Sequence, residues 1–376
     1  MSKYLRRSAL ALAACAAAAQ AQAQAQAQTQ AQTQVQLYGR LNMAAEYVKA
    51  SATADGPRLS QQRVSNNRSV LGFRGSEDLG AGVSAIFQVE GTLSLDTGAG
   101  ELARRDTRIG LDGGFGTLFA GHWVTAYNGA TSSLDPFYPT TAGYMSIIGN
   151  GAGAAVDNVN NLSSFDRRQA NSIHYWSRPW KGVGLRLTHG LAEERPASGA
   201  RPSLTSAAVV YEQGPWYATL AHERHHEYQG PGLRDSGTKL AVARRFGDTR
   251  VALLAERLAY ETAAGGLDRN AWYVSVTHQL GAHGVRFGLA HAGDGKGDGR
   301  GAGGNRVGSV RGGPDTGATH VTLGYEYTLS KRSALYAYVT HLDNEANGAY
   351  DFAINSLDAA PGASLTGAAL GLRHAF

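Results

Sequence analysis

Apolar and polar residues alternate along segments of about ten residues, and this pattern recurs from residue 35 to the C-terminus. In the first segment, Val35, Leu37, Leu41 and Met43 fall on one face, with polar residues between them. Successive residues of a β-strand point to opposite faces of the sheet. The pattern therefore predicts many strands that each have one apolar and one polar face.

Sixteen such segments can be counted, and many are longer than the five or six residues common in soluble sandwiches. Their polar faces carry Arg, Gln, Asn and Glu, which suits a water-filled interior. The predicted strands lie near 35–48, 64–75, 83–95, 103–112, 117–124, 168–177, 183–193, 204–212, 216–225, 238–246, 250–260, 270–280, 285–292, 318–328, 333–343 and 364–376.

The connections between these segments alternate between short turns and longer irregular stretches. The long ones lie near 125–165, 193–203, 225–237, 261–269, 293–317 and 345–363. Short turns on one side and long loops on the other are typical of outer-membrane barrels. We expect an all-β fold, a 16-stranded antiparallel transmembrane β-barrel, over residues 35–376.

The N-terminus is typical of an exported protein. Lys3, Arg6 and Arg7 precede a short apolar stretch, so we expect a signal peptide over residues 1–23 and a low-complexity Ala/Gln segment over 24–34. Without those three cations the formal charge falls from +5 to +2, which does not indicate a nucleic-acid partner. The only cysteine, Cys15, lies in the signal, and whether it is lipidated is left open.

Several motifs resemble those of the trimeric general porins of Gram-negative bacteria, especially the β-proteobacterial and neisserial type. The residues at 35–39 and 71–80 (VQLYG and LGFRGSEDLG) are similar to the first strand, and to the second strand with its turn. Those at 329–336 and 371–376 (LSKRSALY and GLRHAF) resemble the penultimate hairpin and the C-terminus. The resemblance extends over residues 35–376.

This resemblance implies a homotrimer whose third loop folds inward to narrow the pore. It implies that Phe376, the terminal residue, is read by the barrel-assembly machinery, and that lipid and lipopolysaccharide of the cell outer membrane surround the barrel. The stretch 123–165 matches the inward loop, and Asp135 matches its acidic element.

Such porins place an arginine cluster opposite that loop. By local match and strand parity, we assign Arg40, Arg68, Arg105 and Arg168 to this basic wall. His122 and His174 stand where the family often has arginine, and they complete the predicted constriction.

The function expected from these residues is passive diffusion of small hydrophilic solutes and ions, with mild anion preference because arginines outnumber acids. We expect no enzyme activity, no catalytic residues, no cofactor and no metal. Two alternatives stay open, an exported β-barrel adhesin and a substrate-specific channel. The latter would carry stacked aromatic residues along its lumen.

Two further sequence features can be interpreted only when their place in the fold is known. The run from His222 to His226 matches the zinc-protease pattern H-E-x-x-H, but on a strand the two histidines would be about 13 Å apart, too far to share one metal. Aromatic residues near predicted strand ends favour a girdle at the lipid interface; examples are Trp123, Trp176, Trp180, Trp216, Tyr217 and Tyr260.

Overall fold

A computed structural model of the chain describes residues 34–151, 157–301 and 305–376. The expected signal peptide, residues 1–23, and all but the last residue of the segment 24–34 lie outside the described residues. No helix in the described ranges is long and apolar enough to span a bilayer.

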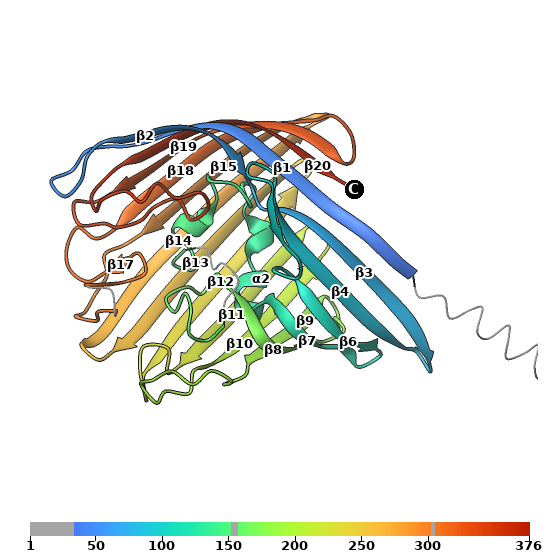
Figure 1. Cartoon of the computed structure of the whole chain (residues 1–376). Coiled ribbons are helices and arrows are strands. Elements are labelled where there is room, and N and C mark those ends of the chain that lie inside the picture. Colours follow the sequence, from blue (N-terminus) through green and yellow to red (C-terminus); the bar gives the residue numbers. More distant parts are fainter. Residues whose placement is uncertain (1–33, 152–156, 302–304) are drawn as a thin grey trace, which may run out of the picture.

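The described chain forms one antiparallel sheet of eighteen strands, and Figure 1 shows it curled around a central space. The strands are β1 (Gln34–Ala50), β2 (Leu59–Asn66), β3 (Ser69–Gly80), β4 (Val83–Ser94), β5 (Ala99–Glu101), β6 (Thr107–Gly113), β7 (Gly116–Val124), β8 (Arg168–Trp176), β9 (Val183–Gly190), β10 (Ser203–Gln213), β11 (Trp216–His226), β12 (Arg234–Phe246), β13 (Thr249–Thr262), β14 (Gly265–Leu280), β15 (His283–Ala292), β18 (Ala318–Thr328), β19 (Ser333–Asn344) and β20 (Leu365–Ala375). A separate hairpin of β16 (Arg306–Val307) and β17 (Val310–Arg311) lies in a long loop.

The first and last strands pair and close the sheet into a barrel. β1 pairs with β20 from Arg40 opposite Ala375 to Ala50 opposite Leu365. On its other side, β1 pairs first with β3 and then with β2. The backbone of Phe376 adds two hydrogen bonds to Gly39, each 3.1 Å long, and its ring covers the space that a side chain at this glycine would occupy.

The predicted 16-stranded barrel is confirmed, because two of the eighteen strands are short continuations of others. β2 continues β3 beyond a break at Asn67 and Arg68, where Arg68 has a φ of 54°. β5 likewise stands above β6, and both pair with β4.

The prediction of a long loop over residues 261–269 is wrong. Residues 261–269 are mostly strand, and only 263–264 separate β13 from β14. The polar sequence there indicated a loop, but the two strands extend together, with Arg257 and Asp268 forming an ion pair of 2.9 Å across them. The polar residues of the hairpin, such as Arg257 and Asp268, lie on its outer face, whereas Leu258 and Leu267 on its inner face are buried.

The outward face of the barrel is apolar, as the alternation predicts. In β13, Leu253 is 54% exposed on the outer face, whereas its neighbours Ala252 and Leu254 are buried inside. Leu240 on the adjacent strand β12 and Leu220 on the next strand, β11, are exposed in the same way. The outer surface therefore presents hydrocarbon-like side chains around the strands.

The main hydrophobic core lies inside the barrel, between one wall and the loop that joins β7 to β8. Along β10 to β15 the inward positions are often alanine, which leaves room for the loop to pack against the wall. The alanines of this wall are Ala208, Ala221, Ala241, Ala243, Ala252, Ala271, Ala290 and Ala292. We call these residues the alanine seat.

Replacing Leu253 by Arg tests the outward assignment. Placing a guanidinium on the lipid face near the bilayer midplane should lower the free energy of unfolding by about 2–4 kcal/mol. Denaturant unfolding from lipid vesicles measures this change. Leu253→Met keeps the volume and apolarity and serves as the control, and equal stability of the two variants would contradict a lipid-facing Leu253.

Candidate functional site

The loop between β7 and β8 is described over residues 125–151 and 157–167, and this part lies within the barrel, where Figure 1 shows it in green among the strands. It contains a helical turn α2 (Ala126–Gly129) and two 3-10 turns, η1 (Ser132–Leu134) and η2 (Tyr144–Ser146). The Thr125 side chain caps α2 by accepting a hydrogen bond from the backbone of Asn128. Apolar loop side chains fill the alanine seat; they are Tyr127, Leu134, Ile147, Ile148 and Phe165.

A buried ion pair fastens this loop to the wall. Glu256 of β13 and Arg269 of β14 lie 2.9 Å apart, and neither side chain is exposed. The Glu256 carboxylate also accepts hydrogen bonds from the Tyr127 hydroxyl and the Gly149 backbone, while Arg269 donates to the carbonyl of Ile147. Because each charge is both paired and bonded to the loop, the pair holds the loop at a fixed distance from the wall.

Asp135 was expected to face the arginines across the lumen, but its carboxylate points into its own loop. It accepts hydrogen bonds from the backbone of Phe137 at 3.0 Å and of Tyr144 at 2.9 Å, and from the Tyr273 hydroxyl at 3.1 Å. The residue is 5% exposed. Burial raises the pKa of Asp135 to about 6, and burial also raises the pKa of Asp166, at the end of the loop, to about 6.

The structure brings Arg40, Arg68, Arg105 and Arg168 together around Tyr138 at the tip of the loop. Arg68 donates to the Tyr138 hydroxyl at 3.4 Å, and Arg40 donates to the backbone carbonyl of Arg68 at 3.0 Å. Although burial opposes the shift, the charges of Arg68, Arg105 and Arg168 lower the pKa of Tyr138. The loop tip therefore presents a hydroxyl, not a carboxylate, to the arginine cluster.

Two of these four arginines are neutralised by carboxylates. Arg105 pairs with Glu90 at 2.8 Å, and Arg168 pairs with Asp106 at 2.7 Å. Within the described part of the chain, Arg40 and Arg68 have no carboxylate within ion-pair distance. The cluster therefore carries a net charge of about +2, the difference between four cations and two anions.

The two histidines are placed differently from each other. His174 is 1% exposed, stacks on Phe119 at 4.7 Å between ring centroids, and contacts the hydroxyls of Ser172 and Thr188. His122 lies at a bulge in β7, and its Nε2 has no hydrogen-bond partner among the described residues. Neither histidine contacts Tyr138 as Arg68 does.

Sequence reasoning missed Arg108. Its guanidinium lies over three aromatic rings, at 4.8 Å from Phe119, 4.4 Å from Trp123 and 5.3 Å from Trp176. The signal was present in the alternation, since Ile109 and its outward neighbours alternate with Arg108.

The same contacts correct part of the expected aromatic girdle. Trp123 is 7% exposed, and Tyr217 and Tyr260 are buried with their hydroxyls donating to the loop carbonyls of Ala130 and Ser163. Trp180 and Trp216 are exposed, at 72% and 41%. These inward aromatic residues pack against the loop or against Arg108 and do not reach the lipid.

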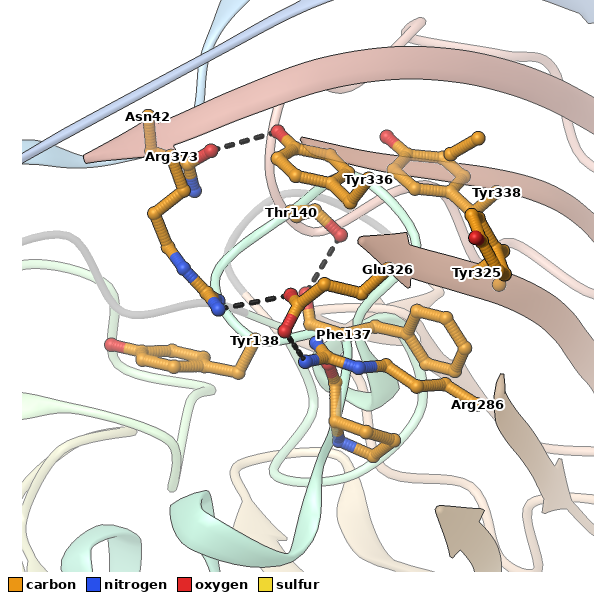
Figure 2. A pocket seen from close by; sticks show the side chains of 13 residues that line it. Asn42, Phe137, Tyr138, Thr140, Arg286, Tyr325, Glu326, Tyr336, Tyr338 and Arg373 are labelled. Carbon is orange, nitrogen blue, oxygen red and sulfur yellow. Dashed lines mark hydrogen bonds and ion pairs between the residues drawn. The ribbon is translucent and has the colours of Figure 1, made fainter. Parts of the chain in front are cut away.

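A second charged group, Glu326 with Arg286 and Arg373, also contacts the loop. Arg373 belongs to β20, which pairs with β1 on the side opposite β3. Figure 2 shows Glu326 between Arg286 and Arg373, with the Arg373 pair at 2.9 Å. Arg286 also donates to the carbonyl of Pro136, which joins the loop to β15. The cavity beside these residues is about 20 Å³, enough for a single water. This contact supports the loop and leaves no space for a solute.

The H-E-x-x-H residues belong to β11, which runs to His226 as an extended strand. Among the described residues, no group of three or more His, Cys, Asp or Glu is arranged to hold a metal.

Known proteins share both the sequence and the fold. A family model described as Gram-negative porin matches residues 8–347. Outer membrane porin protein 32 of Delftia acidovorans is 28% identical over 361 residues, 90% of this chain and 93% of that protein. The anion-selective porin from Comamonas acidovorans has a TM-score of 0.73 and 24% identity, covering 92% of this chain and 100% of the other. The trimer form of OmpT of Vibrio cholerae has a TM-score of 0.65 and 16% identity, covering 92% and 99%.

Glu256→Gln tests the fastening of the loop. The substitution leaves Arg269 buried without its counter-charge, which should cost about 3 kcal/mol of unfolding free energy. We also expect added noise in the open-channel current as the loop loosens. Unfolding in denaturant and bilayer recordings measure the two effects.

The matched control is Glu101→Gln, which breaks an exposed pair with Arg104. This change should alter stability by less than about 1 kcal/mol. If the two variants are equally stable, apolar packing alone holds the loop.

Proposed function

This chain belongs to the Gram-negative porin family, and we propose that its lumen favours small hydrophilic anions over cations. The protein is an outer-membrane β-barrel that forms a water-filled channel for passive diffusion of small solutes. In a barrel of this kind the short turns face the periplasm and the long loops face outward.

One observation carries the proposed anion preference, the surplus of guanidinium groups where the loop tip meets the wall. Arg40 and Arg68 add two charges that form no ion pair with a carboxylate among the described residues. Arg108 adds a third, held by aromatic rings instead of an acid. A fixed positive potential raises the local concentration of anions and lowers that of cations.

The predicted constriction consists of Arg40, Arg68, Arg105, Arg168, His122, His174 and Asp135, and we now assign these residues unequal roles. The arginines attract the solute, and the Tyr138 hydroxyl offers it a hydrogen bond. Asp135 shapes the loop that carries Tyr138. The sequence led us to expect an electric field between the arginines and the Asp135 carboxylate. Because Asp135 points into its own loop, we propose that the arginines set the field in the lumen.

We further infer that the protein works as a homotrimer, after export by its signal peptide and insertion by the barrel-assembly machinery acting on Phe376. Lipid and lipopolysaccharide would then contact the outward residues not covered by neighbouring copies. The trimeric state of the OmpT neighbour supports this arrangement through the shared fold.

Arg68→Gln should weaken the anion preference by about twofold. A unit charge about 8 Å from a passing ion contributes roughly 0.5 kcal/mol in water, which corresponds to that factor. Reversal potentials of single channels in a KCl gradient give the permeability ratio of chloride to potassium.

Arg201→Gln removes an exposed arginine between β9 and β10 and serves as the control. It should leave the ratio close to that of the unmodified protein. Cation preference in the unmodified channel, or an equal shift in both variants, would refute the proposal.

A further inference from the structure

A second cationic site lies at the short-turn end of the lumen, away from the constriction. A cavity of about 470 Å³ opens between the inner wall of β9 to β13 and the loop. Three arginines line it, Arg186, Arg245 and Arg250, and Glu212 is the one carboxylate among its lining residues. These four residues belong to the described part of the chain, and none of them takes part in an ion pair there.

Two of the arginines oppose each other directly. Arg245 of β12 and Arg250 of β13 are cross-strand partners in the sheet. Like charges in this position repel each other and destabilise the sheet. Glu212 lies in the same cavity and acts on Arg250 electrostatically, but among the described residues it forms no ion pair with either arginine, so one carboxylate faces three cations.

The guanidinium groups are partly positioned by the loop. Arg250 donates to the carbonyl of Ser133 at 3.0 Å, and Arg186 donates to that of Gly129 at 3.3 Å. Each contact uses one nitrogen of a group that has several donors. The remaining N–H donors of both residues, and those of Arg245, are left to the cavity.

We propose that this cavity binds a small multivalent oxyanion carrying phosphate or carboxylate groups. Such an anion can bridge Arg245 and Arg250, relieving their repulsion, while Arg186 donates to a second charged group. A cavity of 470 Å³ holds a molecule of that size. The site would retain multivalent anions at the periplasmic mouth, whereas monovalent chloride would pass.

The test measures block of chloride current by inorganic pyrophosphate, with citrate as the carboxylate probe. Purified, refolded channels in planar bilayers should show a saturable loss of current with each probe that the cavity accepts. Arg245→Gln should raise the half-blocking concentration about tenfold, and Arg245→Glu should raise it further, because one charge-assisted contact is lost or reversed. Calorimetric titration of pyrophosphate into the detergent-solubilised protein should show the same order of affinities.

Arg244→Gln is the matched control. Arg244 neighbours Arg245 in sequence but lies over the rings of Trp216 and Phe246, each at 4.6 Å. The Arg244→Gln substitution removes the same charge from the other face of the strand. Block of the chloride current by pyrophosphate should therefore stay as in the unmodified channel. Resistance to heat before gel electrophoresis shows whether each variant has folded.

The outcomes separate this site from the constriction. If the Arg245 variants keep the original block, or if Arg244→Gln weakens it equally, the proposal is wrong. If only Arg68→Gln weakens block, the anion binds at the constriction and the proposed cavity site is also wrong. Anion preference in the KCl gradient is measured separately, so either proposal can fail without the other.

Discussion

The pairing of β1 with β20 is the constraint on which the rest of this structure depends. Hydrocarbon offers no hydrogen-bond partner, so an open edge would leave a row of backbone amides and carbonyls unsatisfied. Closure removes that edge. It also fixes which residues face inward, because a shift of one residue would turn every side chain to the opposite face.

Once the barrel is closed, its interior must be filled without being blocked. The wall of β10 to β15 does this with small side chains, which allow the loop to pack closely. The buried charges of Glu256 and Arg269 then set where the loop stops. The opposite wall carries the long cationic side chains of Arg40, Arg68, Arg105 and Arg168, which lie around Tyr138 at the tip of the loop.

The alternation of residues was enough to predict the barrel and its sixteen strands, because period-two patterning follows directly from strand geometry. The inward third loop, by contrast, was expected only from the family resemblance. The alternation was weaker at 261–269, where the outward residues Glu261 and Asp268 are polar and the inward Leu267 is apolar, the reverse of the pattern elsewhere in the barrel. The assignment of Arg40, Arg68, Arg105 and Arg168 to one basic wall came from the family resemblance and strand parity, and their role at a constriction stays a prediction.

The orientation of individual polar groups could not be predicted in the same way. Asp135 turns into its loop because two backbone amides and a tyrosine hydroxyl satisfy it there. Arg108 is held by three rings that come from two other strands, so no local motif could reveal the cage. Such contacts depend on the three-dimensional register of the strands.

The alanine seat has a consequence for any variant that lacks the loop. Its methyl groups lie among the buried charges of Lys239, Glu256 and Arg269 on the same inner wall. The loop residue Tyr127 covers Lys239 and donates a hydrogen bond to Glu256. Without the loop these charges would face the water of the passage, so a shortened loop would change the electrostatics of the channel as well as its width.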